Sequence, residues 1–145
     1  MIKKILTYPE HKEILTQISQ EVKSIEEVKE LIQDLKDTLH STDGKGISAI
    51  QIGEAKQVCI CSWGGKEIVM INPVITRTRG NEKYLEGCLS YPGRYIEVPR
   101  AQKVWCSYLD ENGDMKEIAE GGRMSNIIQH ELDHFKGDCP VFEKE

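Results

Sequence analysis

The sequence predicts an α+β protein, and three observations carry that prediction. A helical repeat of apolar residues occupies residues 25–39, runs of β-type residues follow it, and a second helix lies near the C-terminus. Gly64-Gly65 and the Asn112-Gly113 pair separate consecutive β-type runs, and such short turns join antiparallel neighbours. Helix, antiparallel strands and helix, in that order along the chain, are typical of the α+β class.

Size and composition limit the kind of protein and its compartment. The 145 residues are expected to form one domain, residues 1–145, that buries about two-thirds of the surface of the unfolded chain. A net charge of −5 gives no basic excess for nucleic acid, and no segment approaches the about 20 apolar residues of a membrane span. Five cysteines, an odd number without a disulfide-type spacing, favour a reducing compartment. We therefore expect a cytoplasmic protein with neither nucleic acid nor a membrane as partner.

The first long helix is predicted from its start signal and its apolar stripe. Ser24-Ile25-Glu26-Glu27 has the pattern of a capping box, in which Ser24 and Glu27 satisfy each other's free backbone donors. Apolar residues then recur at helical spacing, namely Ile25, Val28, Leu31, Ile32, Leu35 and Leu39. The charged residues between them indicate a solvated back, so this helix is expected to pack on the core.

The strands follow in the middle of the chain. Residues 57–63 and 66–71 read as a hairpin across Gly64-Gly65, residues 74–79 continue as a strand, and residues 102–109 pair with 115–119 across 110–114. Cys59 and Cys61 lie on one face of the first strand. A metal role is open to this pair, but without a second pair nearby core packing is favoured.

The second helix carries the motif around which the chemistry is expected, Gln129-His130-Glu131-Leu132-Asp133-His134. His130 and His134 are four residues apart and therefore share one helix face, where they can bind one metal ion. Glu131 is placed to act as general base on a water held by that ion. The helix is expected to stop near Gly137 and Pro140.

A third ligand is needed, and Cys88 is the best candidate because it follows a glycine and precedes a turn. Two imidazoles and one thiolate would leave a fourth position for water, which is typical of a catalytic site. The alternative is a closed structural zinc site with Cys139 as fourth ligand. The apolar residues that follow Cys139, and the unused carboxylate at Glu131 that a closed site would imply, favour the open site.

Three segments resemble the signature motifs of peptide deformylases in order and spacing. They are Gly44-Lys45-Gly46-Ile47-Ser48-Ala49-Ile50-Gln51, Glu86-Gly87-Cys88-Leu89-Ser90, and Gln129-His130-Glu131-Leu132-Asp133-His134. The resemblance runs from Ile5 to the end of the chain. The first motif departs from the family, which usually has an apolar residue at Lys45 and alanine at Ser48. The sequence resembles short members without the C-terminal extension, because it ends at Glu145, soon after the metal helix.

The resemblance implies antiparallel sheets packed around the central C-terminal helix, and removal of the formyl group from N-terminal formyl-methionine with release of formate. It implies one divalent ion held by Cys88, His130 and His134, usually Fe²⁺ in cells, with Zn²⁺, Ni²⁺ or Co²⁺ as substitutes. The residues alone do not choose the metal, because such a donor set suits zinc equally well. The side-chain amide of Gln51 and the backbone N–H of Leu89 are the implied donors to the oxyanion.

The implied substrate site draws on the same motifs. Its residues are Gly46, Lys45, Ile47, Glu86 and Gly87, with Tyr84, Tyr95 and Ile127 around the methionine side chain. Tyr84 and Tyr95 could equally be half-buried aromatic residues without a role. Lys45 either packs through its alkyl stem or places its ammonium along the substrate channel. Glu86 is further implied to pair with Arg100 as a structural brace.

Partners follow from the implied activity. They are N-formylmethionyl nascent peptides, with at most a transient association with the ribosome, since a C-terminal helix for docking is not expected. Two other classes stay in view. A general metallopeptidase would normally take its third ligand from a histidine or a carboxylate, and a binding protein with an inactive site would have lost Cys88, Gln51 or Glu131, all of which are present.

Overall fold

A computed structural model describes residues 1–143 of the chain. The predicted chain end at Glu145 lies outside the described residues. The helical elements are α1 (Lys12–Leu15), η1 (Ile25–Val28), α2 (Lys29–His40), η2 (Ala49–Ile52) and α3 (Gly122–Phe135). The strands are β1 (Gly46–Ser48), β2 (Val58–Trp63), β3 (Lys66–Arg79), β4 (Glu82–Cys88), β5 (Tyr91–Arg100), β6 (Lys103–Leu109) and β7 (Met115–Gly121). The predicted α+β class is confirmed.

The larger sheet has five strands in the order β1-β2-β3-β6-β7, and every neighbouring pair is antiparallel. Both predicted hairpins are present in it. Gly64 and Gly65 adopt φ angles of 62° and 81°, the positive values that a tight two-residue turn requires. β3 continues without a break through the predicted strand at 74–79, with register irregularities between Ile71 and Val74 and between Ile75 and Arg77.

A second sheet consists of β4 and β5 alone, and the sequence did not predict it. Apolar and polar residues alternate too weakly along these two segments to predict strands, because several residues that face outward are apolar or glycine. The register shifts between Glu86 and Cys88, just before the hairpin turns at Leu89-Ser90. This sheet forms the wall that brings Cys88 to the metal helix.

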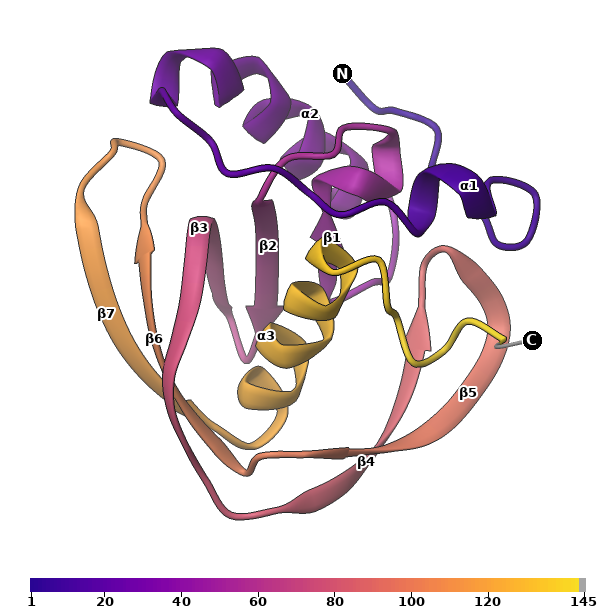
Figure 1. Ribbon diagram of the computed structural model, residues 1–145, viewed down its shortest axis with the longest axis vertical. Coiled ribbons are helices and arrows are strands. Elements are labelled where there is room, and N and C mark those ends of the chain that lie inside the picture. The colour runs from indigo at the N-terminus through magenta and orange to yellow at the C-terminus, as the bar shows by residue number, and fades with distance from the viewer. Residues whose placement is uncertain (144–145) are drawn as a thin grey trace.

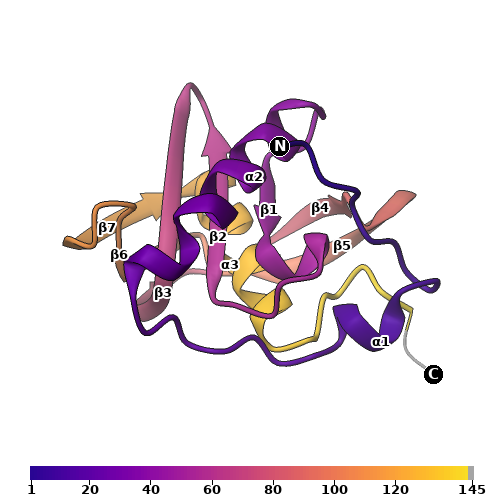
Figure 2. The ribbon, with the colours of Figure 1, turned by 90° about the horizontal axis from the view of Figure 1, so that it is seen from above.

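The helix α3 lies between the two sheets, as expected of the helix that carries the metal motif. Figure 1 shows it in the centre, with β1 to β3 on one side and the β4-β5 ribbon on the other, and Figure 2 shows the same arrangement from above. It packs mainly against β1 and β2. One core cluster fills the space between α3 and the large sheet, and it includes the buried residues Cys59, Cys61 and Cys106. The position of Cys59 and Cys61 agrees with the favoured prediction that this pair packs in the core.

The start of the first long helix differs from the prediction. Residues 25–28 form a 3₁₀ turn before α2 begins at Lys29, and the Ser24 side chain makes no cap hydrogen bond. The Glu27 carboxylate accepts instead from the backbone N–H of Lys23, at 3.1 Å. The tighter 3₁₀ turn changes the spacing of the free backbone N–H groups at the start of the helix, so the predicted capping box is wrong. The apolar stripe is as predicted and faces a core cluster under β1 and β2.

Within residues 1–143, no helix has the length and apolar content that crossing a membrane would take.

Candidate metal centre and active site

The histidines of α3 and the end of β4 bring their donor atoms together. His130 and His134 lie one helical turn apart, with ring centroids separated by 5.1 Å. The Sγ atom of Cys88 lies 3.4 Å from Nε2 of His134. Both histidines are buried and Cys88 is half-buried. The structure thus assembles the donors that the sequence predicted, from elements 42 and more residues apart in the chain.

Cys139 belongs to the same cluster, which was the less favoured reading of the sequence. Its Sγ lies 3.8 Å from Nε2 of His130, and its side chain is buried. The four donor atoms of Cys88, His130, His134 and Cys139 all lie within 4.8 Å of one another. Hydrogen bonds from Cys88 and the two histidines lower the pKa of Cys139, against the effect of burial. Cys139 is therefore more than a core residue.

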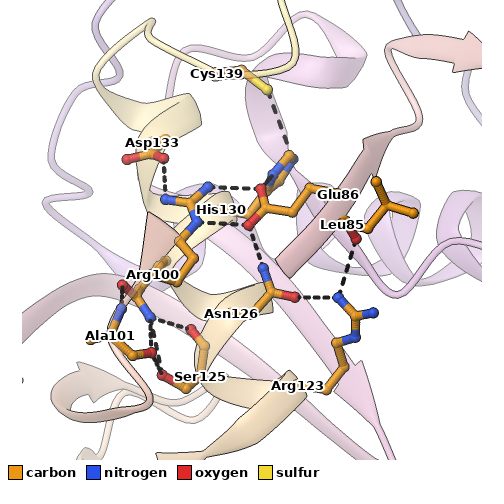
Figure 3. A network of polar contacts seen from close by, with 11 residues as sticks. Leu85, Glu86, Arg100, Ala101, Arg123, Ser125, Asn126, His130, Asp133 and Cys139 are labelled. Atoms are coloured by element: carbon orange, nitrogen blue, oxygen red, sulfur yellow. Dashed lines mark hydrogen bonds and ion pairs between the residues drawn. The ribbon is translucent and has the colours of Figure 1, made fainter. Parts of the chain in front are cut away.

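A buried polar network holds the first histidine in place (Figure 3). Nδ1 of His130 donates to Oε1 of Glu86 at 2.7 Å, so Nε2 is the ring nitrogen left to face the cluster. Glu86 accepts two further hydrogen bonds from Nε and Nη2 of Arg100, at 2.7 and 2.8 Å, and one from Asn126. Arg100 also pairs with Asp133 at 2.6 Å. The predicted brace between Glu86 and Arg100 is present, and it reaches a metal ligand.

The electrostatics of Glu86 follow from these partners. Burial raises the pKa of its carboxyl, but the hydrogen bonds and charges of Arg100 and His130 outweigh burial and hold the pKa below its ordinary value. Glu86 therefore stays ionised and keeps the imidazole of His130 oriented. Although Glu86 lines the cavity described below, its oxygens are occupied by this network.

Glu131 lies beside the cluster, where its side chain is buried and borders the cavity described below. Its Oε1 accepts a hydrogen bond from Oγ of Ser48 at 2.9 Å. Burial raises the pKa of Glu131, although the two histidines and the Ser48 hydroxyl oppose it. Its other oxygen, Oε2, faces Gly46, where a Cβ would lie only 2.4 Å away. Gly46 thus makes room for the carboxylate itself, in addition to its predicted contact with the substrate backbone.

The two predicted oxyanion donors both lie close to Cys88, Gln51 through its side-chain amide and Leu89 as the next residue in the chain. Nε2 of Gln51 is 3.6 Å from Sγ of Cys88 and 3.1 Å from Oγ of Ser90, and its Oε1 accepts from the backbone N–H of Ser48 at 2.9 Å. Gln51 is buried, so its amide is fixed. Leu89 follows Cys88 in the turn between β4 and β5. Both residues line the cavity.

A cavity of about 520 Å³ opens onto the cluster from the side of the β4-β5 sheet. Most of the predicted catalytic and substrate residues line it. They are Lys45, Gly46, Gln51, Glu86, Gly87, Cys88, Leu89, Tyr95, Ile127, His130 and Glu131. The Tyr95 ring lies over Gly87, where a Cβ would lie 2.6 Å from it. The cavity is large enough for a peptide end with one extended side chain.

Two predicted substrate residues lie elsewhere. The Ile47 side chain is completely buried in the core cluster under α2, because successive residues of β1 point to opposite faces. Tyr84 is not among the described residues that line the cavity. Its ring stacks under the guanidinium of Arg123, 5.4 Å away, and its hydroxyl donates to Glu82 at 3.3 Å. Its alternative reading, a half-buried aromatic residue, describes this position better.

Sequence reasoning assigned no role to Ser48, Asn126 or Asp133, although Ser48 contacts Glu131, Asn126 contacts Glu86, and Asp133 pairs with Arg100 of the brace. Ser48 stands within the first motif as a departure from the family, and the departure itself was a signal. Asp133 lies inside the metal motif, three residues after His130, so its side chain is one turn away. Asn126 is four residues before His130 on the same face, and helical spacing could have placed it beside the ligand.

The donor set fits a metal ion. Two imidazoles and thiols within 4.8 Å of one another are ligands that zinc and iron accept, and Glu86 orients His130 as partners of metal-bound histidines usually do. Nδ1 of His134 is buried without a hydrogen-bond partner among residues 1–143. The α+β fold, this donor set and the adjoining carboxylate define a metalloenzyme with an H-E-x-x-H helix.

Comparison with known proteins places the chain more narrowly. Residues 2–141 match the family model described as polypeptide deformylase, and the chain belongs to this family. The peptide deformylase of Aquifex aeolicus is 42% identical over 144 residues, which cover 94% of this chain and 84% of that protein. The crystal structure of a peptide deformylase from Legionella pneumophila superposes with a TM-score of 0.89 at 37% identity, covering 95% of this chain and 83% of that one. A peptide deformylase from Thermotoga maritima gives a TM-score of 0.91 at 25% identity over 99% of both chains.

Proposed function

We propose that this protein is a metal-dependent hydrolase that removes the formyl group from the N-terminal formyl-methionine of newly made polypeptides and releases formate. One observation carries the proposal. Glu131 is a buried carboxylate that lines the cavity directly beside the cluster of metal donors. Family membership and the donor set support the same activity.

The residues divide the chemistry between them. Cys88, His130 and His134 would hold the ion, which supplies an acidified water and polarises a carbonyl when bound. Glu131 would accept the proton of the attacking water and return it to the leaving amine. Burial raises the pKa of Glu131. This brings its pKa closer to those of the water that gives the proton and the amine that receives it.

Charge that develops on the formyl oxygen needs hydrogen-bond donors. The amide of Gln51 is fixed next to Cys88 and would supply one, and the backbone N–H of Leu89 would supply the other. A fixed donor of this kind typically contributes about 3 kcal/mol to transition-state stabilisation. Lys45, Gly46, Gly87, Tyr95 and Ile127 line the same cavity and remain our predicted contacts to the peptide.

We further propose one divalent ion for each chain, Fe²⁺ in cells, with Zn²⁺, Ni²⁺ or Co²⁺ able to replace it. Imidazole and thiolate ligands suit all of these ions. Residues 1–145 would act as one catalytic domain in the cytoplasm. Its substrates would be N-formylmethionyl nascent peptides, with at most a transient association with the ribosome.

Two peptides of one sequence test the proposal. One carries formyl-methionine at its N-terminus and the other a free amine, and each is mixed with protein kept anaerobic and loaded with Fe²⁺. The expected result is formate from the formylated peptide only, with no cleavage of internal peptide bonds. A general metallopeptidase would cut the free-amine peptide and release no formate, and that outcome would overturn the proposal.

A further inference from the structure

We propose that the thiol of Cys139 is a fourth protein ligand of the metal ion, beside Cys88, His130 and His134. With Cys139 bound, the ion would have four protein ligands and no position for water. Release of Cys139 would open the position that catalysis needs. The inference rests on the donor cluster and on the metal part of the proposed function, and it is independent of the formyl substrate.

Distances within the cluster match a tetrahedral ion. Zinc bonds of about 2.3 Å to sulfur and about 2.0–2.1 Å to nitrogen hold a sulfur and a nitrogen about 3.6 Å apart at a tetrahedral angle. The observed separations are 3.4 Å for Cys88 and His134 and 3.8 Å for Cys139 and His130. Each thiol thus lies at ligand distance from one imidazole. No pair of the four donor atoms is separated by more than 4.8 Å.

The orientation of His130 argues against simple core packing of Cys139. Buried thiols are common, and most behave as small apolar groups. Here, however, Nδ1 of His130 is committed to Glu86, so Nε2 is the nitrogen left to face the cluster, 3.8 Å from the Cys139 sulfur. The other buried thiols of the described chain, Cys59, Cys61 and Cys106, are not part of the donor group.

A tightly fixed turn delivers Cys139 to this position. After α3 ends, the backbone N–H of Gly137 donates to His134 and that of Asp138 to Asp133, at 3.1 and 3.2 Å. Gly137 has a φ of 68° and lies against Thr16, whose carbonyl oxygen would be 2.1 Å from a Cβ at this position. Glycine is therefore required for the chain to fold back over His130.

The segment after Cys139 is also anchored. The Phe142 ring stacks on Tyr8 at 4.6 Å between centroids and meets His134 edge-on at 5.8 Å. Nε of Arg94 donates to the backbone carbonyl of Val141 at 2.7 Å. These contacts hold Cys139 near His130 and His134 before any metal binds, so little ordering of the chain would be needed for coordination. The thiol proton passes to solvent when the sulfur binds the ion, and returns when the sulfur leaves it.

Cobalt substitution measures the number of sulfur ligands directly. Co²⁺ bound by thiolates absorbs in the near ultraviolet through charge transfer from sulfur, and the intensity for each ion rises with the number of thiolates. The intensity is expected to fall to about half in Cys139→Ala, which retains one of two thiolate ligands. Cys106→Ala is the matched control, because it also removes a buried thiol but one outside the cluster, and it should match the wild type.

X-ray absorption of the zinc form gives a second count. Two sulfur neighbours for each zinc are expected in the wild type and one in Cys139→Ser, which keeps the side-chain size if the alanine variant folds poorly. Zinc affinity should fall at least about tenfold in both Cys139 variants. One sulfur neighbour in the wild type, or equal cobalt intensities in wild type and Cys139→Ala, would overturn the inference.

The outcome is separable from that of the proposed function. Two sulfur ligands without formate release would uphold the fourth ligand and refute the deformylase. Formate release with one sulfur ligand would do the reverse. If both hold, addition of a formyl-methionyl peptide to the cobalt form should lower the charge-transfer intensity, because the sulfur of Cys139 has to leave the ion; unchanged intensity during turnover would show that Cys139 is not released.

Discussion

Replacement of Gly46 by alanine should impair catalysis through a direct collision with Glu131. The added Cβ would lie 2.4 Å from Oε2, 3.0 Å from Cδ and 3.1 Å from Cγ of that side chain. Contacts between such atoms are ordinarily about 3.4 Å or more, so the carboxylate would have to move by about 1 Å. That movement would break or lengthen the 2.9 Å hydrogen bond from Ser48 and take the buried carboxylate away from its present position beside the metal donors.

The size of the effect follows from that displacement. Misplacing a catalytic group by about 1 Å costs about 10²-fold in rate, or about 2.7 kcal/mol of barrier height. Overpacking should also lower the free energy of unfolding by about 1–3 kcal/mol. The three atoms nearest to the new methyl group all belong to Glu131, which is not a metal donor, so the metal content should stay at one ion for each chain.

Steady-state kinetics of formate release, with metal analysis of the same samples, measure this prediction. Gly121→Ala is the matched control. Its φ is −112° and its Cβ would lie 3.5 Å from the carbonyl oxygen of Gln102, an ordinary contact. Shortening the carboxylate in Gly46→Ala/Glu131→Asp should recover part of the loss, since contacting residues are not additive. A Gly46→Ala protein with normal kcat would show that the position of Glu131 is not critical.

Three further predictions concern the support of the site. Cys88→Ala should retain little metal by elemental analysis, and a full complement would exclude Cys88 as ligand. Arg100→Ala should lower the free energy of unfolding in urea by about 3–5 kcal/mol, because it leaves the buried carboxylate of Glu86 without its two strongest donors, and a loss below about 1 kcal/mol would contradict this. Ser48→Ala removes a hydrogen bond that opposes the effect of burial, so the pKa of Glu131 should rise. Because the base must be ionised to act, the acidic limb of the pH profile of kcat/KM should move to higher pH. An unmoved limb would count against Glu131 as the titrating base.

Local signals in the sequence were sufficient for the metal helix and for both hairpins of the large sheet. The spacing of His130 and His134 fixes their common face, and Gly64-Gly65 supplies the two positive φ angles of the turn. The capping box at Ser24 failed because a 3₁₀ turn and an α-helical turn begin with the same residue types but present different free donors.

Features that depend on long-range packing were not predictable in this way. The β4-β5 ribbon is defined by its pairing and by Tyr95 lying over Gly87, and neither leaves a regular apolar pattern. Cys139 reaches the cluster only because the turn at Gly137 folds against Thr16, more than 100 residues earlier in the chain. The apolar residues after Cys139 indicated a core position, and that position proved to adjoin the metal donors.

Formate release by the wild type and by Glu131→Gln, compared at equal metal content, tests the central claim most directly. Both proteins should carry one ion for each chain, because Glu131 is not among the clustered donor groups. The wild type should release one formate for each formyl-methionyl peptide, and the variant should lose at least about 10²-fold in kcat, as expected when a general base is removed. Equal rates in the two proteins, or no formate from fully metallated wild type, would contradict the account.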